Sequence, residues 1–79
     1  MGMWTPVGSE VDALELVKMF GGEASASRIA RRQRWSPNYG RCICNSLARR
    51  DYLDLLKEGW ARYRLTPQGE LALVERGIA

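Results

Sequence analysis

The chain has 79 residues, of which 46% are hydrophobic and 27% charged, with a formal net charge of +3 and no histidine. This length suits one small domain with one modest core, and the apolar fraction is typical of a globular chain rather than a disordered one. No apolar run approaches the ~20 residues of a membrane helix, and residues 1–8 lack the charged and apolar regions of a signal peptide. We therefore expect a cytoplasmic protein with no membrane association.

The first helix is predicted from Glu10 to Phe20, after a flexible arm at 1–8 and at the start of a single domain at 9–79. Ser9 is a candidate N-cap, and Gly21-Gly22 ends the helix because glycine accepts the left-handed cap conformation. Apolar residues recur on one face at helical spacing. On the other side we expect a solvated acidic face, formed by Glu10, Asp12 and Glu15.

The next segment is strongly cationic. Between Ala24 and Arg50 there are seven arginines and no acidic residue, so this third of the chain carries +7 and the remainder −4. Its pattern predicts a helix capped by Ser25 and ending at Gln33, then a turn in which Trp35 is an apolar plug between helices. A charge separation of this kind is typical of proteins that bind a polyanion, most often nucleic acid. The arginines are Arg28, Arg31, Arg32, Arg34, Arg41, Arg49 and Arg50.

Ser36-Pro37 predicts the start of a third helix, at 37–50, because serine can cap a helix and proline suits its first turn. Gly40 weakens an isolated helix, so its place on the inward side indicates close approach by a neighbouring helix. Helical spacing puts the inward side at Gly40, Ile43, Cys44 and Leu47. It puts the outward side at Asn38, Cys42, Asn45 and Arg49, flanked by Tyr39, Arg41 and Ser46.

The last third changes period. Two short β-type runs, Leu53–Leu56 and Trp60–Leu65, are separated by a turn at 57–59 and predict an antiparallel hairpin. Thr66-Pro67 then repeats the cap-and-proline signal and opens a final helix. We predict an inward stripe of Leu71, Val74 and Ile78. Leu73 then faces away, either as a single exposed apolar residue or in contact with a second chain.

Catalysis is not expected. The chain has no histidine as a general base, no glycine-rich phosphate loop and no paired-carboxylate motif. Cys42 and Cys44 point to roughly opposite sides of a helix, and two thiols are too few for a structural zinc site. We expect one buried and one surface thiol, no metal and no cofactor, and the sequence indicates no small-molecule ligand.

The order of these elements resembles the winged helix-turn-helix family of bacterial and archaeal transcription regulators. Residues 25–32 look like the positioning helix of that family, residues 35–39 like the turn and start of its recognition helix, and residues 63–69 like the end of its wing and the Leu-Thr-Pro-x-Gly signature. The resemblance covers Ser9 to Ile78. It implies a mainly α fold with a small β-hairpin (α+β), in the order α-α-α-β-β-α.

The charge and the resemblance together predict a regulator that binds double-stranded DNA, with helix 37–50 in the major groove and hairpin 53–65 as a wing on the backbone. Asparagine and arginine are residue types that read adenine and guanine, whereas arginines elsewhere on the surface would contact phosphates. The predicted base-reading residues are Asn38, Tyr39, Arg41, Asn45 and Arg49. The predicted phosphate-binding residues are Arg28, Arg31, Arg32, Arg62 and Arg64.

Two other functions are compatible with the sequence. The same fold and charge could serve a protein-interaction module with an acidic partner, or RNA or ribosome association. One small domain offers few base contacts, so for the DNA-binding function we also predict a homodimer that uses the first helix, the arm or the last helix.

Overall fold

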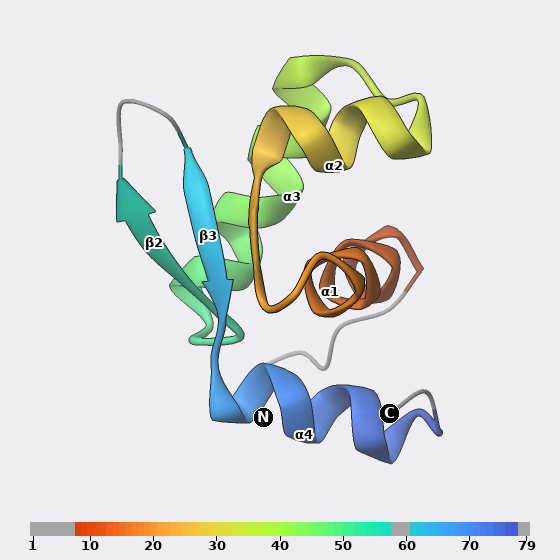
Figure 1. The fold of residues 1–79 in the computed structure, drawn as a ribbon, viewed down its shortest axis with the longest axis vertical. Coiled ribbons are helices and arrows are strands. Elements are labelled where there is room, and N and C mark those ends of the chain that lie inside the picture. The colour runs from red at the N-terminus through yellow and green to blue at the C-terminus, as the bar shows by residue number, and fades with distance from the viewer. Residues whose placement is uncertain (1–7, 58–60, 78–79) are drawn as a thin grey trace.

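The computed structural model describes residues 8–57 and 61–77, in which four helices pack beside a small sheet that lies at one edge of the molecule (Figure 1). None of the helices in these ranges is long and apolar enough to cross a bilayer. The elements are α1 (Ser9–Met19), β1 (Glu23–Ser25), α2 (Ala26–Gln33), α3 (Pro37–Arg49), β2 (Leu53–Lys57), β3 (Arg62–Leu65) and α4 (Pro67–Glu75).

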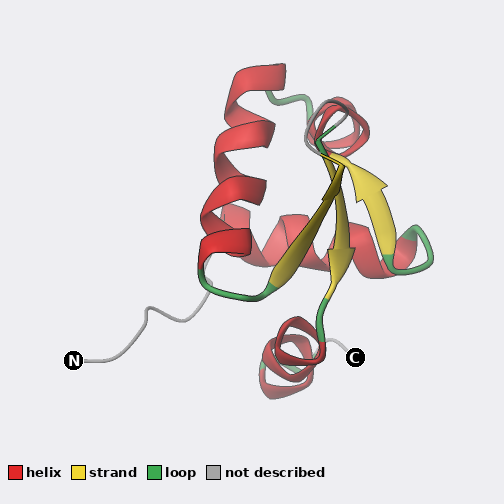
Figure 2. Ribbon diagram, turned by 90° about the vertical axis from the view of Figure 1, so that its left-hand side faces the viewer, coloured by secondary structure: helices red, strands yellow, loops and turns green. Residues whose placement is uncertain are grey.

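The predicted mainly α fold with a small antiparallel hairpin is confirmed, and the sheet has one strand more than predicted. Its order is β1-β3-β2, with both pairs antiparallel, so β3 lies in the centre (Figure 2). Tyr63 of β3 is opposite Ala24 of β1 on one side and Leu55 of β2 on the other. The register shifts between Leu55 and Lys57, so Leu56 is a bulge residue in the edge strand β2.

Side-chain caps fix the starts of three helices, as the sequence predicts. The Oγ of Ser25 accepts the Arg28 N–H at 3.1 Å, and the Oγ of Ser36 accepts the Tyr39 N–H at 3.1 Å. Thr66 is buried; its Oγ1 accepts the Gly69 N–H at 3.0 Å and donates to the Asp51 carbonyl at 2.6 Å. Each cap satisfies a backbone donor that the first helical turn leaves free.

The start of α1 differs from the prediction. Ser9 is the first helical residue rather than the cap, and Gly8 stands at the cap position with no side-chain hydrogen bond. The Oγ of Ser9 instead accepts a hydrogen bond from the hydroxyl of Tyr39 on α3, at 3.1 Å. The predicted arm and hairpin turn lie largely outside the described residues, which exclude 1–7 and 58–60.

The core lies between the four helices and the sheet. Its largest fully buried side chains include Leu14 of α1, Ile29 of α2, Leu47 of α3 and Tyr63 of β3. Along β3 and the residue before it, Ala61 and Tyr63 are buried while Arg62 and Arg64 are exposed, because successive side chains of a strand point to opposite faces.

The predicted inward stripe of α4 is wrong. Leu73 is fully buried in the core, whereas Leu71 and Val74 are 56% and 53% exposed. The helix carries apolar residues on more than one side, so the spacing of these residues does not show which side is buried. The buried side is the one on which Leu73 packs against the rest of the core. The third predicted member, Ile78, lies outside the described residues.

Helices α2 and α3 approach closely at Gly40, as its inward place predicts. A Cβ at this position would lie 2.7 Å from the Cβ of Ala30 and 3.1 Å from the carbonyl oxygen of Ala26. The inward residues Cys44 and Leu47 are fully buried and Ile43 is half-buried. The absence of a side chain at one residue therefore sets the distance between the two helices.

We expect Gly40→Ala to lower the free energy of unfolding by about 1–3 kcal/mol, because overpacking against Ala30 and a backbone oxygen outweighs the gain in helix propensity of up to ~1 kcal/mol. Urea unfolding measures the change. Cys42→Ala, on the exposed side of the same helix, is the control and should cost no stability. The double variant Ala30→Gly/Gly40→Ala should lose less stability than the sum of the losses in the two single variants, because it lacks the methyl group that clashes. Full additivity would contradict the proposed clash.

Candidate nucleic-acid interface

The turn between α2 and α3 orients the two cationic helices. Arg34 ends α2 in the left-handed conformation, with φ 63°, and the Trp35 N–H donates to the Ala30 carbonyl at 2.8 Å. Trp35 is half-buried against the core, which confirms its role as an apolar plug, and its ring meets the Tyr39 ring edge-on with centroids 5.1 Å apart. The start of α3 is thus held on α2 by the turn and on α1 by the bond between Tyr39 and Ser9.

Five arginines on α2, the turn and α3 are open to solvent. All five are exposed, and none makes an ion pair with a residue in the described ranges. Like charges gathered without acidic neighbours raise the local potential and attract anions. We call this set the arginine face: Arg31, Arg32, Arg34, Arg41 and Arg49.

The outward side of α3 carries most of the predicted base-reading residues. Asn38, Tyr39, Arg41 and Arg49 are all exposed, as is Cys42. Tyr39 is nevertheless engaged at both its ring and its hydroxyl, so its side chain has a fixed position.

Asn45 does not lie freely on this side, contrary to the prediction. It is half-buried, and its Oδ1 accepts a hydrogen bond from the hydroxyl of the buried Tyr63. The periodicity of α3 places Asn45 in the outward row correctly, but it cannot reveal that β3 passes beneath this point of the helix.

The predicted phosphate-binding residues fall into two groups. Arg31 and Arg32 belong to the arginine face, whereas the other three have neighbours within the fold. Arg28 places its guanidinium 4.1 Å from the centroid of the Phe20 ring, in a cation–π contact. Arg62 pairs with Glu23 at 3.3 Å and Arg64 with Asp54 at 3.8 Å.

These two pairs on the sheet are about half exposed, and exposed pairs contribute only ~0–1 kcal/mol. A phosphate can therefore compete for either arginine at little cost. The hairpin nevertheless presents less free positive charge than its two arginines alone suggest.

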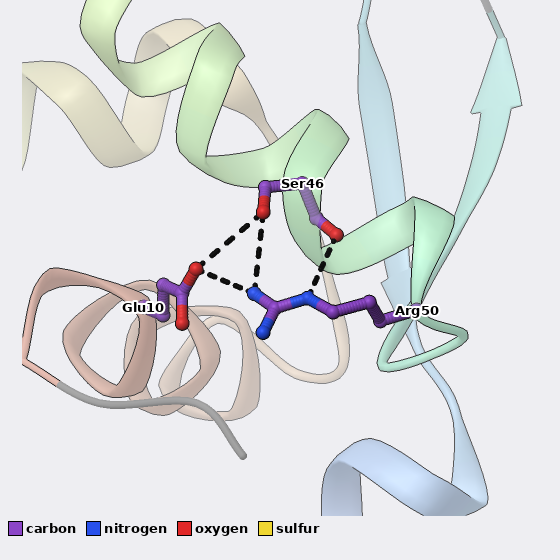
Figure 3. A network of polar contacts seen from close by, with 3 residues as sticks. All are labelled: Glu10, Ser46 and Arg50. Carbon is purple, nitrogen blue, oxygen red and sulfur yellow. Dashed lines mark hydrogen bonds and ion pairs between the residues drawn. The ribbon is translucent and has the colours of Figure 1, made fainter. Parts of the chain in front are cut away.

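Arg50 is not part of the surface (Figure 3). Its Nη2 lies 2.5 Å from the Glu10 Oε2 and donates to the Ser46 Oγ at 3.2 Å, while its Nε donates to the Ser46 carbonyl at 3.3 Å. The Arg50 and Glu10 side chains are only 15% and 20% exposed. The expectation that Glu10 belongs to a solvated acidic face is thus wrong: it neutralises one of the seven arginines and ties α1 to α3.

The two thiols occupy different environments, as predicted. Cys42 is exposed on α3, and Cys44 is buried in the core, where burial raises its pKa to about 12. The described residues contain no group of three or more His, Cys, Asp or Glu side chains that could hold a metal ion.

A groove of about 590 Å³ lies between α1 and α4, away from the arginine face. The apolar residues Val11, Leu14, Tyr52 and Leu71 line it, together with Glu75 and Arg76, which are adjacent and of opposite charge. Figure 1 places α4 at the opposite end of the molecule from α2. The predicted orientation of α4 buries Leu71, so it did not indicate that this residue would line a groove.

Comparisons of the chain with models of protein families, with curated proteins and with solved structures give no match. The candidate interface is therefore defined by its residues and their geometry.

The two neighbouring arginines at the end of α3, Arg49 and its C-cap Arg50, should behave differently when changed. Arg50→Gln should lower the free energy of unfolding by about 1–3 kcal/mol, because it leaves the half-buried Glu10 carboxylate without this partner. Arg49→Gln is the matched control and should change stability by less than ~0.5 kcal/mol, because its side chain is exposed. Urea unfolding compares the two, and equal effects would contradict the assignment of Arg50 to the fold.

Proposed function

We propose that the protein binds double-stranded DNA as a transcription regulator in the cytoplasm, in the manner of a winged helix-turn-helix protein. The observation that carries this proposal is the arginine face, whose five exposed cations have no acidic partner among the described residues. A fold gains little stability from concentrating like charges on adjacent helices. Binding of a polyanion does gain affinity from them, because the arginines neutralise its charges and its counterions are released into solvent.

Helix α3 is the element that would enter the major groove. It has 13 residues, or roughly 20 Å at 1.5 Å per residue, and the groove of B-DNA is about 12 Å wide and admits a helix. Its exposed side includes Asn38, Arg41 and Arg49, whose side chains carry the donors that meet base edges. Arg31, Arg32 and Arg34 on α2 and the turn would contact the flanking phosphates.

The hairpin β2–β3 would lie on the DNA backbone beside α3. Arg62 and Arg64 are 52% and 54% exposed in their side chains and would exchange their carboxylate partners for phosphates. Because Glu23 and Asp54 would be left near the backbone, we expect the hairpin to contribute less to affinity than the arginine face does.

Duplex DNA is favoured over single-stranded RNA by the placement of the aromatic rings. Proteins that bind single strands stack bases on exposed aromatic side chains. Among the aromatic residues in the described ranges, Tyr39 alone is exposed, at 44%, and its ring and hydroxyl already have partners.

A second copy of the chain is the occupant we propose for the groove between α1 and α4. Leu71 and Val74 are three residues apart, so they form one exposed apolar strip along α4. A two-fold interface must complement itself, and the adjacent Glu75 and Arg76 provide both signs of charge for this. The arginine faces would remain at the far ends of such a dimer, free to contact two half-sites.

The DNA-binding proposal predicts two classes of arginine. Arg49→Ala should cost ~1–3 kcal/mol of binding free energy and relax the preference at one base position. Arg32→Ala should weaken binding to all sequences alike and lower the salt slope by about one unit. Fluorescent duplex DNA, titrated at several salt concentrations beside a duplex RNA of equal length, measures both effects.

The control is Lys18→Ala, which removes one cation from α1, outside the proposed contact surface, and should change neither quantity. Alkylation of the exposed Cys42 thiol reports the orientation, since DNA in contact with α3 should protect it while the buried Cys44 stays unreactive. Absence of duplex binding at low salt would reject the function, and equal effects of Arg49→Ala and Arg32→Ala on every sequence would reject the orientation.

The dimer proposal predicts that Leu71→Glu separates the two copies. A carboxylate at this exposed position can be hydrated in the monomer but would be buried in the dimer. Sedimentation equilibrium should give the mass of two chains for the native protein and of one chain for the variant. Met19→Glu, at a residue that is 60% exposed and outside the groove, should remain dimeric. A native mass of one chain at high micromolar concentration would contradict the dimer.

A further inference from the structure

Asn45 occupies a central place on the proposed DNA-reading side of α3. It lies one helical turn after Arg41 and one turn before Arg49, both of which are exposed. Unlike these neighbours it is half-buried and has a partner within the fold, the hydroxyl of Tyr63. An asparagine in such a row can donate through Nδ2 and accept through Oδ1, so its orientation decides which bases it can read.

The position of Tyr63 is fixed by the sheet. Its side chain is fully buried, and its residue is paired with both neighbouring strands in the centre of the sheet. Burial also raises the pKa of the Tyr63 phenol, which therefore stays protonated and able to donate at neutral pH. The hydroxyl donates to the Oδ1 of Asn45.

This contact also selects one orientation of the Asn45 amide. Within the described part of the chain the Tyr63 hydroxyl has no other hydrogen-bond acceptor. Rotating the amide by a half-turn would bring the Nδ2 donors to the hydroxyl and leave a buried O–H without an acceptor, which is costly. The fold thus keeps Oδ1 directed at Tyr63, while the Nδ2 donors make no hydrogen bond within the described residues.

We propose that Tyr63 makes Asn45 a hydrogen-bond donor to DNA, so that this residue reads guanine or thymine rather than adenine; the proposal rests on the DNA binding proposed above. Recognition of adenine by asparagine uses both atoms, since Oδ1 accepts from N6 and Nδ2 donates to N7. Because Oδ1 is directed at Tyr63 inside the protein and not at the groove, the Nδ2 donors are the ones that can meet DNA, and they suit the acceptors of guanine N7 and O6 or of thymine O4. Tyr63 is then a positioning residue for specificity, although it touches no base.

The test begins with selection of preferred sites from a randomised duplex library by the native protein and by Asn45→Ala. The base-pair position at which only the native protein shows a preference is the one read by Asn45. The native protein should prefer guanine or thymine at this position. Tyr63→Phe frees Oδ1 and should raise the relative affinity for adenine at that position about tenfold, with the other positions unchanged. In the Asn45→Ala background, Tyr63→Phe should have no further effect on preference.

A measurement without DNA separates this proposal from the proposed function. The side-chain amide resonances of Asn45 should shift between the native protein and Tyr63→Phe in NMR spectra, while those of the exposed Asn38 stay in place. If Tyr63→Phe does not fold, Asn45→Asp replaces it: the carboxylate still accepts from Tyr63 but presents an acceptor outward, which should move the preference to cytosine.

The outcomes are distinct. The role of Tyr63 would be overturned, with DNA binding intact, if the native protein preferred adenine at the position read by Asn45. An unchanged preference in Tyr63→Phe, or in Asn45→Asp if that variant replaces it, would overturn it as well. If the native protein binds no duplex, the function and this role both fail, and the NMR shift then shows only that the hydrogen bond exists.

Discussion

The close approach of α2 and α3 at Gly40 is the constraint on which the arrangement of the charged surface depends. Because no side chain stands between the helices, the Ala30 methyl group and the Ala26 carbonyl take the space that a Cβ would fill. The two helices are therefore held in direct contact at this point, which fixes how the arginines of one helix lie relative to those of the other. A larger separation would divide the same charges between two weaker patches.

Helix α3 is connected to the rest of the fold near its start, near its middle and just beyond its end. Each connection is a polar contact of one side chain, and Asn38, Arg41 and Arg49 take no part in any of them. These three exposed positions are therefore free to carry residues that the core does not require. A helix held along its whole length presents those residues with a fixed geometry, which is what recognition of a rigid partner demands. The connections are Tyr39 with Ser9, Asn45 with Tyr63, and Arg50 with Glu10 and Ser46.

The features predicted correctly from the sequence are those with local causes. Ser36 and Thr66 identify helix starts because a cap and its N–H partner are three residues apart, and the exposed residues of α3 follow from helical spacing. Strand β1 has three residues and no β-branched side chain, so only its pairing with β3 makes it a strand. The burial of Leu73 and the partners of Arg50 and Asn45 depend on residues distant in the chain, which no local pattern encodes.

The sheet order has a consequence for how the chain folds during synthesis. The central strand β3 is synthesised last of the three. It pairs with β2, which immediately precedes it in the chain, and with β1, which lies before α2. Contacts between neighbouring segments form before those that close long loops, so α2 and α3 can associate while β1 and β2 still lack a partner. We therefore expect the nascent chain to display its arginine helices first and to cover its apolar core only after Leu65 has left the ribosome.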